Sequence, residues 1–403
     1  MSWSEKRVLV TVAGADAPGI AATLVGIIAA AGAQLRDIEQ VVVQGHLTLC
    51  LVVGVDREPS HGSPVVKDLL FAAKELGLDL DFEVLDDKPD PKLGATSLYA
   101  LTVIGDEVDA AAVHALTSAL ARFGANIETI KRLSDVTLSS VEIVVSVESD
   151  EAKVMALHKE LVSVAAERDV DLAFQRERLT RRSKRLVVMD MDSTLIRIEV
   201  IDELARAYGV YDQVADITTR AMQGNMPYEQ SLIERVALLK GMPLAAVMKV
   251  AGDPPVMEGA PELLRALRVL GMKTAVISGG FSFAADALRA RFGIDYAYSN
   301  TLEVKGNQLT GRVLEPIVGP QRKADLLDAL AQREGIPLEQ TVAVGDGAND
   351  LLMLERAGLG IAFHAKPKLR AAADTSLTKG GLDRILYLLG LRARDVRELL
   401  DGE

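Results

Sequence analysis

The fold is decided by one stretch of the chain, Val187-Val188-Met189-Asp190-Met191-Asp192-Ser193-Thr194-Leu195. Its apolar first residues predict a short buried strand, and its two acidic residues predict a turn at the carboxyl end of that strand. Ligands of open parallel sheets bind beside this end of the strands. The same residues also fit an Asx-type turn after an edge strand, so other segments must decide between a structural turn and a site.

Three later segments supply the remaining parts of a phosphoryl-transfer site. A strand from Lys273 ends in Ser278-Gly279-Gly280, a helical run follows Lys323, and a third strand ends in Gly345-Asp346-Gly347-Ala348-Asn349-Asp350. One carboxylate can act as a nucleophile, and another can serve as general acid and base. Hydroxyl and backbone N–H groups can hold phosphate oxygens, a lysine neutralises their charge, and oxygen-rich acidic loops suit Mg²⁺.

These motifs, in this order, resemble the haloacid dehalogenase-like phosphatase superfamily over roughly residues 184–396. The resemblance implies that Asp190 forms an aspartyl-phosphate and that Asp192 is the acid–base group. Relatives that stop at the phosphoenzyme have Thr at the position of Asp192, so an Asp there is typical of phosphatases or phosphomutases. The implied catalytic residues are Asp190, Asp192, Ser278 and Lys323, and the implied Mg²⁺ ligands are Asp190, Asp192 and Asp346.

The short sequences DMDST, SGGF and GDGAND most resemble phosphoserine phosphatases. Residues 198–256 have helical periodicity and resemble the cap that closes over the substrate in this superfamily. The resemblance implies that Glu199 receives the ammonium of phosphoserine and that Arg235 pairs with its carboxylate, although residue type alone also fits an ordinary salt bridge. The other implied substrate contacts are Met222, Tyr228, Ser278, Gly279, Lys323 and Asn349, with Asp350 supporting the site; Tyr228 stands where relatives often have Phe.

The first 180 residues contain an internal duplication. Each copy predicts the ferredoxin-like order strand, helix, strand, strand, helix, strand. The predicted ranges are 6–13, 18–31, 33–43, 46–56, 63–77 and 78–85, then 97–104, 109–123, 125–134, 137–148, 151–168 and 169–176. The polar segment Asp86–Lys92, with two prolines, is typical of a linker between the copies.

The two copies resemble ACT domains, which bind amino acids as regulators. The loop Gly14-Ala15-Asp16-Ala17-Pro18-Gly19 resembles their effector loop, so the resemblance implies effector contacts at Asp16 and Gly19. The second copy reads Gly105-Asp106-Glu107-Val108-Asp109 and lacks the Pro-Gly, which puts a second effector site in doubt. Both copies also fit modules used only for packing or oligomerisation.

The sequence therefore predicts an α/β protein with three parts. Residues 1–87 and 95–178 are the two ferredoxin-like (ACT) domains, and residues 184–396 form a doubly wound parallel-sheet hydrolase domain with a helical cap at about 198–256. Within that domain, strands are predicted near 186–190, 273–277 and 341–345, and Gly306-Asn307 predicts a hairpin turn. The basic run Thr180–Arg185 is interpreted as a solvated linker or helix end.

Composition narrows the possible partners of this 403-residue chain. The formal net charge of −12 argues against nucleic acid. A single cysteine, Cys50, excludes an intramolecular disulfide and favours a reducing cytoplasm. The apolar run from Gly19 to Ala33 is shorter than the ~20 residues of a membrane span, so it predicts a buried helix and no membrane partner. Because ACT-like sheets often associate edge to edge, we predict a homodimer.

The predicted function is Mg²⁺-dependent hydrolysis of O-phospho-L-serine, the last step of serine biosynthesis, with an amino acid such as serine as a possible effector. Three alternatives stay open. The chain could act on another small ester such as homoserine phosphate or a sugar phosphate, could dephosphorylate proteins, or could serve as an amino-acid-sensing regulatory protein. Transfer of the phosphoryl group to an alcohol is a further variant of the same chemistry.

Overall fold

A computed structural model describes residues 6–55, 64–85, 96–135, 137–223, 225–365, 369–370, 373 and 375–401. The chain divides into two compact parts, Met1–Leu93 and Gly94–Glu403, and each is considered by itself. The linker predicted at Asp86–Lys92 lies outside the described residues.

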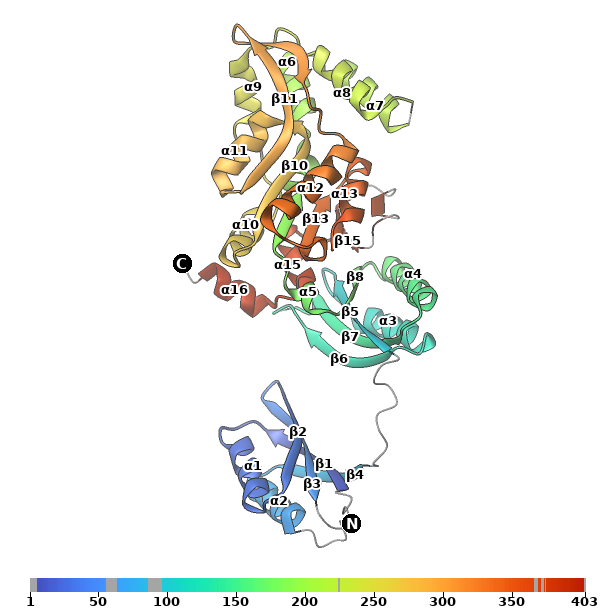
Figure 1. Ribbon diagram of the computed structural model, residues 1–403, viewed down its shortest axis with the longest axis vertical. Coiled ribbons are helices and arrows are strands. Elements are labelled where there is room, and N and C mark those ends of the chain that lie inside the picture. The colour runs from blue at the N-terminus through green and yellow to red at the C-terminus, as the bar shows by residue number, and fades with distance from the viewer. Residues whose placement is uncertain are drawn as a thin grey trace. The chain divides into compact units, whose positions relative to one another are not determined.

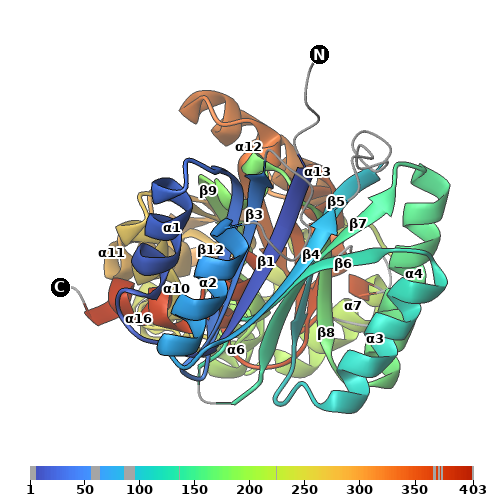
Figure 2. The ribbon, with the colours of Figure 1, turned by 90° about the horizontal axis from the view of Figure 1, so that it is seen from below.

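The first part is one ferredoxin-like unit, which we call the first unit. It is a four-stranded antiparallel sheet with two helices packed on one face (Figure 2). Its elements are β1 (Lys6–Ala15), α1 (Ile20–Ala30), β2 (Gln34–Val43), β3 (His46–Val55), α2 (Pro64–Glu75) and β4 (Asp79–Leu85). The strand order β2-β3-β1-β4 is ferredoxin-like. Alternate residues of β1, Val8, Val10 and Val12, are fully buried against the helices. This alternation is the signal from which the strand was predicted.

The second part, Gly94–Glu403, begins with another ferredoxin-like unit, which we call the second unit. Its elements are β5 (Thr96–Ile104), α3 (Ala110–Arg122), β6 (Asn126–Arg132), β7 (Ser140–Glu148), α4 (Glu151–Glu167) and β8 (Asp171–Arg176). The strand order β8-β5-β7-β6 repeats that of the first unit. Both helices begin at an aspartate whose side chain accepts a backbone N–H, from Ala112 to Asp109 at 2.7 Å and from Ala152 to Asp150 at 2.9 Å. The predicted duplication is therefore confirmed in the fold.

The strands that follow form a doubly wound sheet that is parallel except for β12, which pairs antiparallel with β11. Its strands are β9 (Leu186–Met189), β10 (Lys273–Phe281), β11 (Tyr296–Lys305), β12 (Gln308–Leu314), β13 (Thr341–Gly345), β14 (Gly360–Phe363) and β15 (Thr375–Leu377). Its helices are α5 (Leu179–Arg182), α10 (Ala260–Val269), α11 (Ser282–Phe292), α12 (Pro320–Glu334), α13 (Leu351–Arg356), α15 (Ile385–Leu388) and α16 (Ala393–Asp401). Helices α10 and α11 cover one face and α12 and α13 the other (Figure 1). All residues of β9 and β13 are buried, as strands covered on both faces require.

The cap consists of four helices between β9 and β10, namely α6 (Val200–Tyr208), α7 (Tyr211–Met222), α8 (Tyr228–Ala237) and α9 (Leu244–Ala251). The chain enters and leaves the cap through two adjacent segments, which we call the cap hinge. In it Ile196 is bridged to Val256, Arg197 N donates to Pro255 O at 2.9 Å, and Met257 N donates to Leu195 O at 2.9 Å. None of the helices in the described part of the chain combines the length and apolar character needed to cross a membrane.

The second ferredoxin-like unit and the catalytic strands share one sheet. Strand β8 lies antiparallel to β15, with Thr375 opposite Ala173, and the strand order is β12-β11-β10-β9-β13-β14-β15-β8-β5-β7-β6. Ala173 and Ile104 of this unit belong to the same apolar core as buried residues of α10 and α11. The sequence predicted separate sheets, because no local pattern indicates which edge strands will pair.

The basic run contains the predicted helix end, α5, and Arg182, Ser183 and Arg185 are exposed, but two of its side chains are not solvated. Arg181 is buried, with its guanidinium 2.5 Å from both Glu142 and Glu177. Lys184 is also buried and donates to the carbonyl oxygen of Glu339 at 2.6 Å. These side chains lie at the junction between the second unit and the parallel sheet. The carboxylates of Glu142 and Glu177 offset the cost of burying Arg181, and the Glu339 carbonyl oxygen receives the Lys184 ammonium.

Candidate active site

Three neighbouring parallel strands place polar side chains at one edge of the sheet. Strand β9 lies between β10 and β13, so their carboxyl ends meet. Asp190 follows β9, Ser278 lies near the end of β10, and Asp346 follows β13. All three are buried. The arrangement matches the prediction that segments far apart in the sequence converge beside this edge.

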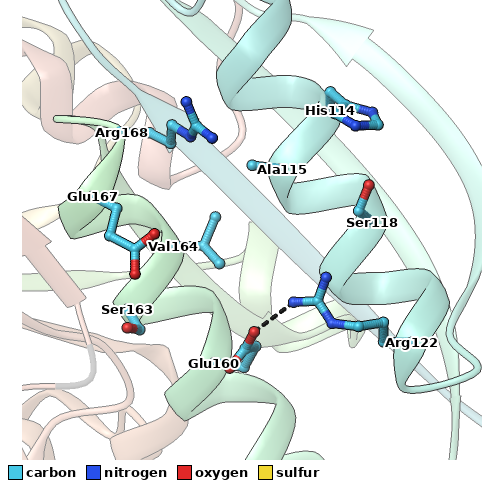
Figure 3. Close-up of a pocket in the computed structure, with 9 residues that line it drawn as sticks. All are labelled: His114, Ala115, Ser118, Arg122, Glu160, Ser163, Val164, Glu167 and Arg168. Atoms are coloured by element: carbon cyan, nitrogen blue, oxygen red, sulfur yellow. Dashed lines mark hydrogen bonds and ion pairs between the residues drawn. The ribbon is translucent and has the colours of Figure 1, made fainter.

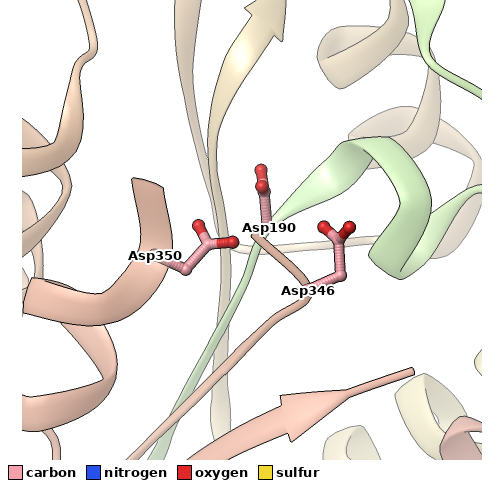
Figure 4. Close-up of side chains that lie close together, drawn as sticks. All are labelled: Asp190, Asp346 and Asp350. Atoms are coloured by element: carbon pink, nitrogen blue, oxygen red, sulfur yellow. The ribbon is translucent and has the colours of Figure 1, made fainter. Parts of the chain in front are cut away.

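A cluster of three carboxylates forms the centre of this site. Asp190, Asp346 and Asp350 each offer an oxygen, and these oxygens all lie within 4.8 Å of one another (Figure 4). Thr194 Oγ1 donates to Asp346 at 3.4 Å, and Gly347 N donates to Asp350 at 3.0 Å. Asp350 was predicted only to support the site, but it lies in the cluster itself. The Asp192 side chain, predicted as a metal ligand, is not among these three.

Lys323 supplies the positive charge beside the cluster. It projects from the first turn of α12, is fully buried, and places its Nζ 2.8 Å from Asp190 and 2.7 Å from Asp350. Burial alone lowers the pKa of Lys323, but the two carboxylates outweigh burial and raise it above its usual value. Burial, and then Asp190, raise the pKa of Asp350 to about 7. The lysine is therefore a permanent cation.

Asp192 lies in a different environment from Asp190. The residue as a whole is partly exposed. Its Oδ1 atom, however, is buried and has no hydrogen-bond partner among the described residues. Burial, followed by repulsion from Glu199 and Asp190, raises the pKa of Asp192 well above its usual value. Asp192 therefore binds its proton more tightly than a solvated aspartate does, which suits a general acid, whereas Asp190 lies 2.8 Å from the Lys323 ammonium.

The Ser278-Gly279-Gly280 loop approaches both the acid and the cap. Ser278 Oγ accepts from Gly280 N at 2.9 Å. A Cβ at position 280 would lie 2.7 Å from Asp192 Oδ2, so only glycine fits there. Tyr228, on the first turn of α8, donates its hydroxyl to Gly279 O at 3.3 Å, which links the cap to the core. Burial raises the pKa of Tyr228 to about 12, so this hydroxyl stays protonated.

Asn300 was not identified from the sequence. Its amide donates to Gly279 O at 2.8 Å and accepts from Val318 N at 2.8 Å, and it is fully buried. It fixes the loop that carries Ser278. The signal that could have identified it is an amide shortly after the apolar segment Tyr296–Tyr298, at a position of β11 that is fully buried. Thr194 was also quoted without a role, although its hydroxyl contacts Asp346.

The predicted substrate residues of the cap lie on α6, α7 and α8. Glu199 begins α6 and accepts from Ser193 Oγ at 2.8 Å. Arg235, on α8, donates to Ser231 O at 3.2 Å and to Thr218 Oγ1 at 3.5 Å. No ion pair joins these two described residues, so the structure contains no ordinary salt bridge between them. Met222 is 66% exposed at the end of α7, and Asn349 is half-buried beside the cluster.

The predicted effector residues belong to the first unit. Asp16 N donates to Gly45 O at 2.9 Å, and Gly19, with φ of 97°, begins α1. Both residues are exposed. The loop therefore presents a helix N-terminus at the surface.

A cavity of about 430 Å³ lies elsewhere, between α3 and α4 of the second ferredoxin-like unit (Figure 3). Arg122 and Glu160 form an ion pair of 2.5 Å across it, and both side chains are largely exposed. None of its lining residues was predicted to take part in function. Exposed pairs of this kind contribute little, so we assign the cavity no ligand.

Family models match three parts of the chain. A haloacid dehalogenase-like hydrolase model matches residues 184–358, and ACT domain models match residues 6–83 and 97–175.

Relatives match almost the whole chain. Phosphoserine phosphatase SerB2 of Mycobacterium tuberculosis is 42% identical over 396 residues, which are 98% of this chain and 96% of that protein. A phosphoserine phosphatase of Streptomyces coelicolor is 42% identical over 96% of this chain and 93% of its own. A solved structure described as "probable phosphoserine phosphatase" of Vibrio cholerae is 36% identical, has a TM-score of 0.58, and covers 75% of this chain and 89% of its own.

Proposed function

Because this chain belongs to the family of haloacid dehalogenase-like phosphoserine phosphatases with two ACT domains, we propose that it hydrolyses O-phospho-L-serine to L-serine and phosphate through an aspartyl-phosphate. The observation that carries the proposal is the different surroundings of two neighbouring aspartates. Asp190 is held against Lys323 at 2.8 Å, whereas burial raises the pKa of Asp192. One group can attack while the other donates a proton.

In the first step, a carboxylate oxygen of Asp190 attacks the phosphorus, and the bond from phosphorus to the serine oxygen breaks. Asp192 gives its proton to that oxygen, so L-serine leaves as the neutral alcohol. In the second step, Asp192 takes a proton from water as the water attacks the phosphorus. The bond between Asp190 and phosphorus then breaks and inorganic phosphate is released. Ser278, Gly279 and Lys323 hold the phosphoryl oxygens through both steps.

We propose that the acidic cluster binds Mg²⁺. Asp190, Asp346 and Asp350 bring three carboxyl groups together beside the single ammonium of Lys323, so the cluster has more acidic than basic groups for a divalent cation to balance. Burial, and then the neighbouring Asp190, raise the pKa of Asp350, and a bound cation would favour its ionised form. Carboxylate oxygens are the ligands that Mg²⁺ prefers, and a bound Mg²⁺ would offset charge on the phosphoryl group. A side-chain contribution from Asp192 stays a prediction.

Selection of phosphoserine is proposed to depend on Glu199 and Arg235. Each is hydrogen-bonded to neutral groups of the chain rather than to the other, which leaves their charges available for the ammonium and the carboxylate of the substrate. A sugar phosphate offers neither group. Tyr228 and Met222 would complete the lining from the cap, and Asn349 would approach from the phosphate side.

Feedback control is proposed for the first ferredoxin-like unit, with an amino acid such as L-serine contacting Asp16 and Gly19. The support is the exposed loop at the start of α1, where backbone N–H groups can receive a carboxylate. We also propose a cytoplasmic homodimer, on the grounds of composition and of the ACT resemblance.

The test is phosphate release from L-phosphoserine, O-phosphohomoserine, phosphothreonine and a sugar phosphate, with Mg²⁺ and with EDTA, and with or without free L-serine. We expect Mg²⁺-dependent turnover with a preference for phosphoserine. Equal rates on the sugar phosphate would refute the roles of Glu199 and Arg235. Inhibition by L-serine that survives in Gly19→Val would place the effector elsewhere.

A further inference from the structure

One short loop joins the second ferredoxin-like unit to the hinge of the cap. It runs from Thr378 to Arg384, directly after β15, and we call it the connecting loop. It is remote in sequence from both the hinge and the predicted motifs. Its contacts on either side are hydrogen bonds to specific polar groups rather than apolar packing alone.

On one side, the connecting loop is held by Asp171, the first residue of β8. The Asp171 carboxylate accepts from Thr378 N at 2.6 Å, from Thr378 Oγ1 at 2.9 Å and from Lys379 N at 2.9 Å. Asp171 is 6% exposed. Hydrogen bonds to a buried carboxylate are among the stronger ones in proteins. An asparagine would lose their charge, and its amide would have to donate to Thr378 Oγ1 instead of accepting from it.

A second contact fixes the other end of the loop to the same unit. Arg384 Nη1 donates to Gly105 O at 2.9 Å. Gly105 begins the segment that corresponds to the effector loop of the first unit. In the second unit this segment therefore packs against the catalytic part, which agrees with the absence of Pro-Gly there. The second unit thus contacts the loop at two points.

On its far side, the connecting loop reaches the cap hinge. Leu382 N donates to Glu258 O at 2.8 Å, and Met257, the next residue back, donates to Leu195 O. Asp383 is packed against Gly259 so closely that a Cβ there would collide with it. Leu195 ends the turn that begins after Asp190 and carries Asp192. Hydrogen bonds, joined by short stretches of backbone at Lys379–Leu382 and at Met257–Glu258, therefore link Asp171 to the turn of the nucleophile.

We propose that Asp171 is a positioning residue for the phosphatase reaction: through the connecting loop it holds the cap hinge and the turn of Asp190 and Asp192 in their active arrangement. The second ferredoxin-like unit then contributes to the phosphatase reaction through the position of this turn. The proposal rests on the proposed function for its kinetic consequence, but its structural consequence can be measured without substrate.

The test compares Asp171→Asn with Asp169→Asn in the full-length chain. Asp169 also contacts the loop, 2.7 Å from Lys379 Nζ, but it is 84% exposed, so its loss should have no effect. For Asp171→Asn we expect kcat/KM for phosphoserine to fall roughly 3- to 30-fold, measured with kcat and KM separately. We also expect faster hydrogen exchange at the hinge amides of Arg197 and Met257, with the amides of β9 and β13 still protected.

Unchanged hinge exchange in folded Asp171→Asn would overturn the proposal, as would faster hinge exchange with unchanged kcat/KM. If Asp171→Asn does not fold, Thr378→Val removes one of the three hydrogen bonds and is judged by the same two readouts. Hinge exchange does not depend on turnover. A chain that failed to hydrolyse phosphoserine would therefore refute the proposed function and still leave the exchange measurement to decide the structural link.

Discussion

Replacing Lys323 by Met should destabilise the protein more than any surface substitution. The Nζ lies 2.8 Å from Asp190 and 2.7 Å from Asp350, and all three side chains are buried. At an effective dielectric constant of about 20, each contact is worth roughly 6 kcal/mol before desolvation is counted. Removing one partner of a buried pair costs about 3–5 kcal/mol, because the remaining charges stay in the interior. We expect a loss of that size in the free energy of unfolding.

The assay is urea unfolding followed by circular dichroism, in EDTA, with Lys273→Met as the matched control. Lys273 pairs with Asp295 at 3.1 Å, but both side chains are about one-third exposed or more, so the control should lose under about 1 kcal/mol. With Mg²⁺ present, Lys323→Met should regain more stability than the unaltered chain, since a bound cation replaces the missing charge. If Lys323→Met and Lys273→Met lost the same free energy in EDTA, the assignment of Lys323 as the counter-charge would be refuted.

Three further substitutions test the site and the junction. Asp192→Asn should slow both formation and breakdown of the phosphoenzyme by roughly 10²- to 10⁴-fold, and normal rates in rapid-quench experiments would remove its proposed role. Tyr228→Phe loses the hydrogen bond to Gly279 and should raise KM for phosphoserine roughly 2- to 10-fold; an unchanged KM would mean that the hydroxyl does not hold the cap. Burial, and then Arg181, lower the pKa of Lys184 from 10.5 to about 8, so the folded state binds fewer protons than the unfolded state between these values. The free energy of unfolding should therefore rise by about 3 kcal/mol from pH 8 to 10.5 relative to Lys184→Met, and equal slopes in urea titrations would contradict this.

Much of the fold was predictable because its signals are local. Alternating valines mark β1, and the apolar run Leu186–Met189 marks a strand covered on both faces. The hairpin turn at Gly306-Asn307 was predicted because both residues can adopt positive φ, and they do, at 59° and 62°. Strand β15 was not predicted, since three residues carry no periodicity. Its pairing with β8 depends on tertiary packing alone.

The site was predictable in its centre and less so at its margins. Asp190, Ser278 and Asp346 could be brought together because the ends of adjacent parallel strands meet. The place of Asp350 in the carboxylate cluster could not, because it depends on how the turn after β13 bends back. The buried Arg181 was misread for a related reason: its partner Glu142 lies in another domain, and a charge appears solvated until that partner is known.

The shared sheet also covers an edge strand at which unspecific pairing between chains could begin. Without the second unit, β15, with the sequence Thr375-Ser376-Leu377, would be an open edge strand whose N–H and C=O groups could pair with another chain. With it, the outermost strand on that side is β6, Asn126-Ile127-Glu128-Thr129-Ile130-Lys131-Arg132, which carries three charged side chains. Charges on an edge strand discourage such pairing. The second ferredoxin-like unit thus replaces an edge strand that could pair with other chains by one whose charges discourage pairing. A fragment limited to the hydrolase motifs should therefore be prone to aggregate.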